Sequence, residues 1–339
     1  MLRVLYALAP VALTAVYFYG WRFAAMIAVA AIAGFITELI MAQRRDGKVS
    51  YACFVTTGLL AVSLTPTTPF WIVGTASVIA ILFGKEAFGG FGKNVFNPAI
   101  VGRAFAFVSF PVEITSRYVP VFRGFPGGFS RWSWLTQKNV PEYLDQAGLT
   151  LADAVSAATP MWTRRDMGFI TPVKDLFFGT INGTFQSDGS WNALSAGSGG
   201  EVCALVILLA GVYLMWTKTA QWRLIVATWC GAIAMNIFLR YILGMHEAPT
   251  IPFTLFSGAL MFGSVFMVTD PVSAPKIPLS QWIYGFFIGC MVVFFRAKAI
   301  FTGGVLFSIL LGNMLSPSLD LWNKRIKAAR SSKPEAGTA

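Results

Sequence analysis

Residues 86–105 read "EAFGGFGKNVFNPAIVGRAF", and this polar, glycine-rich stretch interrupts a chain that is otherwise strongly apolar. Asn97-Pro98 cannot continue an ordinary helix, because Pro98 lacks an N–H group and pushes the residue before it out of the helical region. A bilayer tolerates such a break only where the freed polar groups find partners inside protein. The released carbonyls, with the amides of Asn94 and Asn97, therefore predict either a polar concavity at membrane depth or a simple helix cap at the membrane interface.

The composition of the whole chain places this break in a membrane. Of the 339 residues, 56% are hydrophobic and 12% are charged, and the mean hydropathy is +0.65. A soluble domain of this length would carry about 25% charged residues. The composition predicts an all-α polytopic membrane protein. The net charge of +11 lies mostly in loops and the tail, so we attribute it to membrane topology and expect no nucleic-acid partner.

The apolar segments fall into two sets of five. The first set lies in residues 1–110 and the second in residues 201–322; a polar stretch, 111–200, separates them and a basic tail, 323–339, follows. The predicted membrane segments are approximately 2–19, 20–42, 51–64, 70–84, 95–110, 201–217, 221–244, 253–268, 281–297 and 302–319. We therefore expect ten membrane helices in two five-helix halves.

The two halves resemble each other at their third segments. "TTGLLAVSLTP" (56–66) and "FSGALMFGSVFMVTDP" (256–271) both begin with a small hydroxyl residue and glycine and stop at proline. Asp270-Pro271 is thus a second break, and it adds a negative charge. Broken segments at corresponding positions are typical of internal repeats. Because five crossings precede the second half, we predict that the two repeats are inverted.

Loop charges predict the orientation of the chain. Basic residues are frequent in the short loops on the side of the N-terminus and in the tail, and scarce in the opposite short loops. Cytoplasmic loops carry such an excess of Lys and Arg. We expect both termini in the cytoplasm and residues 111–200 outside.

Several chemistries are excluded by the residues themselves. "GGFGKN" (89–94) is not a phosphate-binding loop, because Asn94 stands where that motif needs Ser or Thr. The four cysteines stand singly in apolar segments and the chain has one histidine, so neither a zinc nor an iron–sulfur site is expected. We predict no metal site and no catalytic residue.

Ionisable residues inside the apolar segments are candidates for function, because each costs at least about 2.5 kcal/mol at the bilayer centre. Glu38 and Asp320 lie near segment ends, where a side chain can reach water at little cost. Arg103 lies deeper and is expected to brace a helix break or to form an ion pair. Glu38, Asp270 and Asp320 are the carboxylates predicted for an ion path.

The polar stretch contains "LADAVSAATPM" at residues 151–161. Its hydroxyl residues Ser156 and Thr159 follow Asp153 and precede Pro160. Taken alone, the pattern indicates a helix N-cap or a turn before proline.

Three blocks of the chain together resemble a known family. They are "GKEAFGGFGKNVFNPAIVGRAFAFVSFP" (84–111), "LFSGALMFGSVFMVTDPVSAP" (255–275) and "GGVLFSILLGNMLSPSLD" (303–320). The likeness, from about residue 30 to 322, is to the NqrB/RnfD family, whose members are membrane subunits of the sodium-translocating NADH:quinone reductase (Nqr) and of the Rnf complex. The resemblance implies ten helices in inverted repeats, similar to ammonium and urea channels.

The resemblance also implies a covalent flavin. Family members carry FMN on the threonine of a D-x-x-(S/T)-G-A-T sequence, attached by a flavin transferase. Here the corresponding residues are Asp153, Ser156, Ala158 and Thr159, with Ala157 in place of glycine. Thr159 is therefore the expected attachment site.

Further flavin contacts follow from the same resemblance. Gly199, Gly200 and Glu201 are expected near the covalent FMN. A second, non-covalent flavin such as riboflavin is expected near the two helix breaks. The residues expected for flavin binding at the breaks and beside them are Asn94, Asn97, Pro98, Arg103, Asp270 and Pro271.

The family implies a flavin-carrying subunit of an Nqr- or Rnf-type redox pump in the bacterial inner membrane. Electrons would pass between a cytoplasmic-side flavin and the external FMN, coupled to movement of Na⁺ or H⁺. Its partners would be other membrane, flavin and iron–sulfur subunits, the flavin transferase, and quinone as a candidate substrate. Two alternatives remain open: a non-redox small-solute transporter or channel of the same fold, and a structural scaffold without flavin.

Overall fold

Long apolar helices dominate the computed structural model, which describes residues 1–331 except 46, 182, 188, 246–248 and 300–302. Within these residues, six helices are long and apolar enough to cross a membrane. They are α1 (Leu2–Tyr19), α2 (Trp21–Arg44), α4 (Phe70–Gly84) with its extension η1 (Glu86–Phe88), α12 (Trp222–Ile237) with its extension η5 (Phe238–Ile242), α15 (Pro278–Lys298) and α16 (Gly304–Ser331). The chain is therefore a multi-pass membrane protein, as its composition predicts.

Four of the predicted segments are too short for a full span. Three are the apolar helices α3 (Ala52–Ser63), α5 (Pro98–Ser109) and α11 (Ala204–Trp216). The fourth, predicted over 253–268, is divided into α13 (Ile251–Phe256), α14 (Leu260–Phe262) and η6 (Gly263–Met267). The helix α5 begins at Pro98 because Asn97 is its N-cap: the Asn97 Oδ1 accepts a hydrogen bond from the Ala99 amide at 3.0 Å.

Residues 111–200 form short elements instead of long helices. They are α6 (Pro111–Thr115), η2 (Gly127–Ser130), η3 (Trp134–Thr136), α7 (Glu142–Asp145), α8 (Leu151–Val155), α9 (Pro160–Asp166), α10 (Val173–Phe178), β1 (Thr184–Ser187), β2 (Ser190–Ala193) and η4 (Gly199–Glu201). The strands β1 and β2 pair antiparallel, with Thr184 opposite Ala193. The all-α prediction therefore holds for the membrane part and not for this region.

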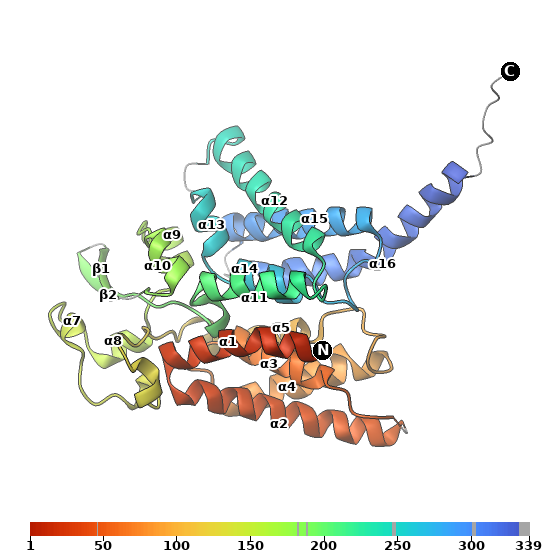
Figure 1. Ribbon diagram of the computed structural model, residues 1–339. Helices are drawn as coiled ribbons and strands as arrows, with labels where there is room; N and C mark the ends of the chain where they lie inside the picture. The colour runs from red at the N-terminus through yellow and green to blue at the C-terminus, as the bar shows by residue number, and fades with distance from the viewer. Residues whose placement is uncertain (46, 182, 188, 246–248, 300–302, 332–339) are drawn as a thin grey trace.

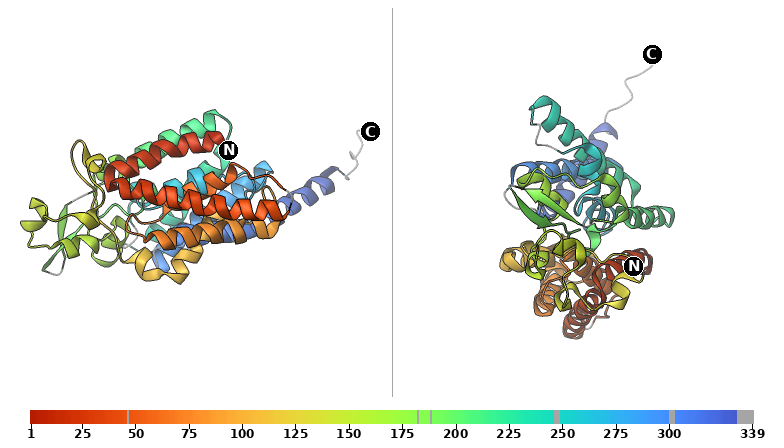
Figure 2. Two further views of the ribbon diagram at one scale, coloured as in Figure 1. Left: turned by 90° about the horizontal axis from the view of Figure 1, so that it is seen from below. Right: turned by 90° about the vertical axis from the view of Figure 1, so that its left-hand side faces the viewer.

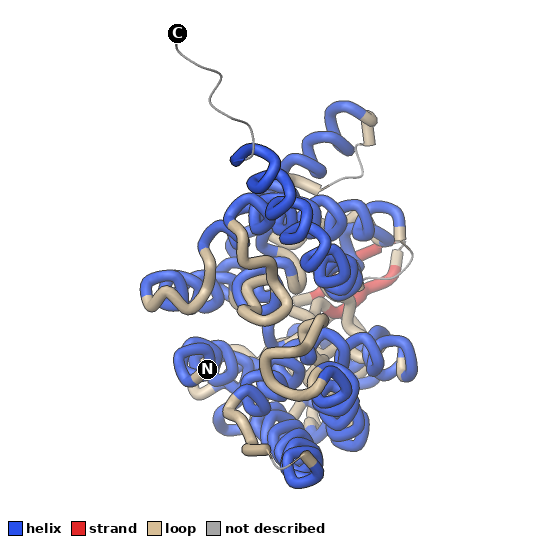
Figure 3. Tube along the Cα trace, turned by 90° about the vertical axis from the view of Figure 1, so that its right-hand side faces the viewer, coloured by secondary structure: helices blue, strands red, loops and turns tan. Residues whose placement is uncertain are grey.

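The membrane helices run roughly along one direction, and the short elements of 111–200 gather at one of their ends (Figures 1 and 2). The N-terminus and the end of α16 lie toward the opposite end. Seen from that opposite end, the molecule is almost entirely helix and loop, with the strands beyond (Figure 3). The N-terminus and the end of α16 thus share a side, and 111–200 lies on the other.

Each half of the chain forms its own group of helices. The first-half helices, red to orange, lie below the second-half helices, green to blue, in the right-hand view of Figure 2. The helices α12 and α15 pack extensively against each other. At Gly289 of α15 a Cβ atom would collide with the backbone of Thr228 in α12, so glycine is needed there for the two helices to approach.

Candidate functional site

Thr159 lies at the start of α9, on the side of the molecule that carries 111–200. The residue is 9% exposed and occupies the N-cap position, yet its side chain makes no capping hydrogen bond. Pro160 follows at the first helical position, where its fixed φ suits the helix start. The hydroxyl of Thr159 is therefore not used to cap its own helix.

The backbone before Thr159 is held by the hairpin. The Ala158 amide donates to the Ala193 carbonyl at 2.9 Å, and the Ser195 amide donates to the Ala158 carbonyl at 3.0 Å. Ala157 is also buried, and its amide donates to the Tyr118 carbonyl at 3.2 Å. These contacts between segments far apart in the chain fix where the Thr159 side chain lies.

Thr159 lines a cavity that we call the outer cavity. Residues from both halves of the membrane part and from 111–200 line it. Its polar lining residues include Ser63, Thr65, Arg103, Tyr118, Thr159, Ser198, Glu201 and Arg296. The tertiary structure thus brings Arg103 of α5 and Glu201 of η4 to the predicted attachment threonine.

Charged groups of both signs surround this cavity. The Glu201 Oε1 accepts a hydrogen bond from the Ser198 hydroxyl at 2.7 Å and lies 3.7 Å from an Arg103 guanidinium nitrogen. Arg296 donates from its two terminal nitrogens to the carbonyls of Thr254, at 2.8 Å, and Ser257, at 3.1 Å. Two guanidinium groups against one carboxylate leave the lining with an excess of positive charge.

Tyr118 supplies a neutral donor to the same cavity. Burial, reinforced by the nearby Glu201 carboxylate, raises the pKa of Tyr118 above its ordinary value. The phenol therefore stays protonated at neutral pH and is able to donate a hydrogen bond.

The other residues predicted for the covalent flavin lie outside the outer cavity. Asp153 and Ser156 are exposed. Asp153 forms a capping box with Thr150 at the start of α8, so it serves the local helix. A Cβ atom at Gly199 would collide with the ring of Phe23, and one at Gly200 would lie 2.9 Å from the ring of Phe262. The two glycines thus permit close packing of η4.

Five polar residues of the outer cavity are not among the residues predicted from the sequence: Ser63, Thr65, Tyr118, Ser198 and Arg296. In the sequence, Arg296 reads as one more charge of a short loop, although it lies in the last turn of α15 next to an apolar run. The one feature of the sequence that could have indicated a role for Arg296 is its position at the end of an apolar segment, which it shares with Glu38. Tyr118 and Ser198 carry no comparable signal.

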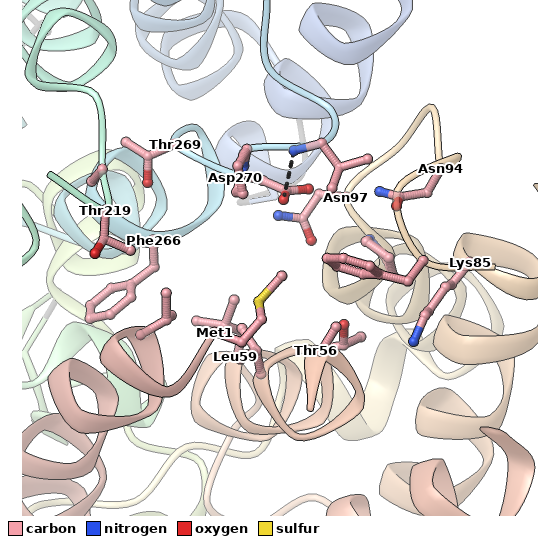
Figure 4. Close-up of a pocket in the computed structure, with 18 of the residues that line it drawn as sticks. Met1, Thr56, Leu59, Lys85, Asn94, Asn97, Thr219, Phe266, Thr269 and Asp270 are labelled. Carbon is pink, nitrogen blue, oxygen red and sulfur yellow. Dashed lines mark hydrogen bonds between the residues drawn. The ribbon is translucent and has the colours of Figure 1, made fainter. Parts of the chain in front are cut away.

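A second cavity, which we call the inner cavity, lies between the helix breaks of the two halves. It has a volume of about 110 Å³ and is lined by all five residues predicted at the breaks, Asn94, Asn97, Pro98, Asp270 and Pro271. Figure 4 shows Asn97 and Asp270 together on one side of this cavity, with Thr56 and Leu59 on the opposite side. The two distant breaks therefore meet in space.

Hydrogen bonds satisfy the polar groups that the breaks release. The Asn97 side-chain amide donates to the carbonyl of Met267, at 3.2 Å, and so joins one half of the chain to the other. Asp270 accepts from the Val272 amide at 3.3 Å and from the Ser273 hydroxyl at 2.8 Å. The cap and the concavity, which the sequence leaves as alternatives, are both present: Asn97 caps α5 and also lines the inner cavity.

Glu38 does not reach water, so the expectation based on its place near a segment end is wrong. Its side chain is fully buried and lies 2.6 Å from the Lys85 ammonium group. It also accepts from the amide of Ser50 at 2.8 Å and from the Ser50 hydroxyl at 2.9 Å. Lys85 in turn lines the inner cavity, so this ion pair lies directly behind its wall.

Asp320 has a separate role at the start of α15. Its carboxylate accepts hydrogen bonds from the amides of Lys276, at 2.9 Å, and Ile277, at 3.3 Å, just before Pro278. Of the three ion-path candidates, only Asp270 lines the inner cavity, while Glu38 lies behind it and Asp320 binds the two backbone amides that precede α15.

Comparison with known proteins identifies relatives over almost the whole chain. A family model described as the NQR2, RnfD, RnfE family matches residues 1–328. The D subunit of the ion-translocating oxidoreductase complex of Yersinia enterocolitica is 30% identical, covering 94% of this chain and 91% of the relative. That of Actinobacillus succinogenes is 28% identical, covering 96% and 91%. The B subunit of the Na(+)-translocating NADH-quinone reductase of Azotobacter vinelandii is 31% identical, covering 88% of this chain and 66% of the relative.

Proposed function

We propose, from the fact that this chain belongs to the NQR2, RnfD, RnfE family, that it is the flavin-carrying membrane subunit of a redox-driven ion pump. Its relatives are named as subunits of ion-translocating oxidoreductases. In this chain, electrons pass between an inner flavin and an FMN on Thr159, and their passage is coupled to the movement of Na⁺ or H⁺. The function depends on neighbouring subunits that supply and remove the electrons, with quinone as a candidate acceptor.

The observation that carries this proposal is the setting of the Thr159 hydroxyl. It makes no cap hydrogen bond and lines a cavity with the guanidinium groups of Arg103 and Arg296. A phosphodiester is an anion, and guanidinium groups bind phosphate oxygens in a planar, bidentate way. Arg103 and Arg296 are therefore suited to hold the phosphate of an FMN ester on Thr159, with the Tyr118 phenol and the Ser198 hydroxyl as further donors.

Ala157 is compatible with this role. Among the described residues, Lys218 is the one non-glycine residue with a positive φ, so the backbone at Ala157 stays in a region that alanine adopts without strain. The glycine of the family pattern is therefore not required here by backbone conformation. FMN bound at Thr159 would supply one- and two-electron chemistry on the side of 111–200.

The inner cavity supports the second flavin. The amide groups of Asn94 and Asn97 and the carboxylate of Asp270 offer donors and acceptors to the polar edge of a flavin ring, and Phe91 and Phe266 offer apolar surface. A non-covalent riboflavin or related flavin bound there lies on the side opposite Thr159, because the inner cavity is lined by Met1 and the outer cavity by residues of 111–200.

Placement in the membrane follows from the same assignment. We place both termini in the cytoplasm of a bacterial cell and 111–200 outside its inner membrane, where the flavin transferase acts. The N-terminus and the end of α16 lie on one side of the molecule, which supports this arrangement (Figure 1). The ten segments in inverted repeats remain part of this proposal, and the meeting of the two helix breaks through the bond from Asn97 to Met267 is compatible with them.

The proposal is tested by expressing the chain in cells together with a flavin transferase and measuring whether flavin becomes covalently attached to it. The wild-type chain is expected to give a fluorescent band on a denaturing gel and an intact mass raised by one esterified FMN. Thr159→Ala is expected to lose both signals. Thr163→Val is the matched control, because it removes another hydroxyl of α9 that bonds within its own helix, to the Pro160 carbonyl at 3.1 Å.

Two results contradict the proposal. A wild-type chain without added mass would favour the non-redox transporter or the scaffold, and a Thr159→Ala chain that keeps its flavin would place the attachment elsewhere. The second flavin is detected separately, by comparing the flavin absorbance of the native protein with that of the denatured chain. Riboflavin that is not covalently bound is released on denaturation, so its absorbance is found only in the native protein.

A further inference from the structure

A third cavity, which we call the basic cavity, lies at the end of the second half that faces 111–200. Its volume is about 290 Å³. It is formed by α9, the outer end of α12 with η5, α13 and the last turns of α15 (Figure 1). Arg164, Arg165 and Arg296 line it together with the apolar side chains of Leu239, Met245 and Val293.

Arg164 is the cation in this cavity whose hydrogen bonding is incomplete. Its Nε atom is buried and has no hydrogen-bond partner in the part of the chain that the structure describes. By contrast, Arg165 pairs with Asp166 through contacts of 2.8 and 3.0 Å, and Arg296 donates to the carbonyls of Thr254 and Ser257. A buried, unpaired guanidinium N–H is costly, so an anionic partner for Arg164 is the missing element.

The described lining residues contain no acidic side chain that could be this partner. The cavity therefore presents positive charge on the α9 side and apolar surface on the α12 and α15 side. Leu239 and Val293, on that apolar surface, are buried.

The basic cavity also adjoins an exposed apolar surface. Ile237, Phe238, Tyr241 and Ile242 are 40%, 42%, 70% and 69% exposed at the outer end of α12 and in η5. Apolar side chains at such positions of a membrane helix contact acyl chains, and aromatic ones are frequent at the level of the headgroups. An anionic group beside Arg164 and a hydrocarbon chain beside Leu239 would belong to one molecule.

We propose that the basic cavity binds an acidic phospholipid from the membrane leaflet on the side of 111–200. The phosphate of the lipid accepts hydrogen bonds from Arg164, with Arg165 beside it, and an acyl chain lies on Leu239, Met245 and Val293. Because Met161 and Arg296 line both the basic and the outer cavity, the bound lipid closes one wall of the cavity that contains Thr159.

The test compares thermal unfolding of the delipidated, detergent-solubilised chain in the presence of dioleoylphosphatidylglycerol, dioleoylphosphatidylcholine or inorganic phosphate. Phosphatidylglycerol is expected to raise the unfolding temperature of the wild type, and the other two are expected to have little effect. Arg164→Gln should require about tenfold or more phosphatidylglycerol for the same shift, because it removes a charge-assisted hydrogen bond. Arg117→Gln, which replaces an exposed arginine on the same side, should respond like the wild type.

Two further variants keep the result interpretable. Ala297→Phe fills the cavity from α15 and leaves the arginines in place, so it should also abolish the shift even if Arg164→Gln fails to fold. Thr159→Ala removes the proposed flavin and should leave the lipid response unchanged, which separates this proposal from the proposed function.

Four outcomes would overturn the proposal. Equal responses of Arg164→Gln and wild type would exclude the arginine site. Equal effects of the two lipids would exclude recognition of the charge. An equal effect of inorganic phosphate would mean a simple anion site without the chains, and loss of the response in Thr159→Ala would mean that the cavity serves the tethered flavin.

Discussion

The buried pair of Glu38 and Lys85 provides the sharpest test of the structure. Their charged atoms are 2.6 Å apart, and their side chains are 0% and 2% exposed. The Lys85 ammonium group also donates to the Ser50 hydroxyl at 2.8 Å. We consider Glu38→Gln, Lys85→Met and the double variant. Because both side chains are buried, water cannot replace the partner that a single substitution removes.

The magnitude follows from what each change leaves behind. Removing one partner leaves an uncompensated charge in the interior, which costs about 3–5 kcal/mol. Replacing both partners removes the two charges together, and such replacements are often close to neutral. The glutamine side chain of the double variant would still accept the hydrogen bonds of Ser50. The double variant is therefore expected to be more stable than either single variant.

The assay is reversible unfolding in mixed micelles of dodecyl maltoside and sodium dodecyl sulfate, followed by tryptophan fluorescence. Lys93→Gln is the matched control, since Lys93 is an exposed lysine on the same side and its replacement should change stability by less than about 0.5 kcal/mol. The reasoning is refuted if each single variant stays within about 1 kcal/mol of wild type, or if the cost in the double variant equals the sum of the two.

The same variants separate a structural role of Glu38 from a role in the ion path. If the double variant folds and the assembled complex still shows the wild-type dependence on Na⁺ and on pH, Glu38 is a structural residue. If it folds and ion movement is lost, the pair of Glu38 and Lys85 belongs to the ion path.

Three further predictions concern a helix contact, a helix start and a titrating cap. Gly289→Ala should lower stability by about 1–3 kcal/mol in the same assay, because its Cβ collides with the α12 backbone, whereas Gly74→Ala, whose nearest contact would be 4.0 Å away, should not. Asp320→Ala should cost about 1 kcal/mol through loss of two backbone hydrogen bonds before α15, and Asp320→Asn should leave the Na⁺ and pH dependence unchanged. Hydrogen bonds from Thr150 hold the pKa of Asp153 below its usual range. The ionised Asp153 side chain therefore stabilises α8 fully above about pH 4, the usual carboxyl pKa. This stabilisation is lost as the pH falls through the lowered pKa. The protection of the α8 amides against hydrogen exchange, corrected for the intrinsic exchange rate at each pH, should therefore fall in acid in the wild type and depend less on pH in Asp153→Asn.

Much of the membrane part could be predicted because it depends on local chemistry. The first predicted segment, 2–19, coincides with α1, and the predicted segment 70–84 coincides with α4. Hydrophobic length is sufficient for such elements, since a helix satisfies its own backbone hydrogen bonds. The start of α5 at Asn97-Pro98 follows equally from two adjacent side chains. The family, too, could be identified from short ordered blocks of residues.

Only the tertiary structure decided which charges meet. Lys85 and Arg22 read as loop charges in the sequence, yet Lys85 pairs with Glu38 at a separation of 47 residues and Arg22 donates to the carbonyls of residues 66 to 68. Likewise, no spacing in the chain brings Arg296 to the cavity of Thr159. Helix formation depends on neighbours within about four residues. Ion pairs and cavities depend instead on how whole helices pack, because their members come from residues that are distant in the sequence.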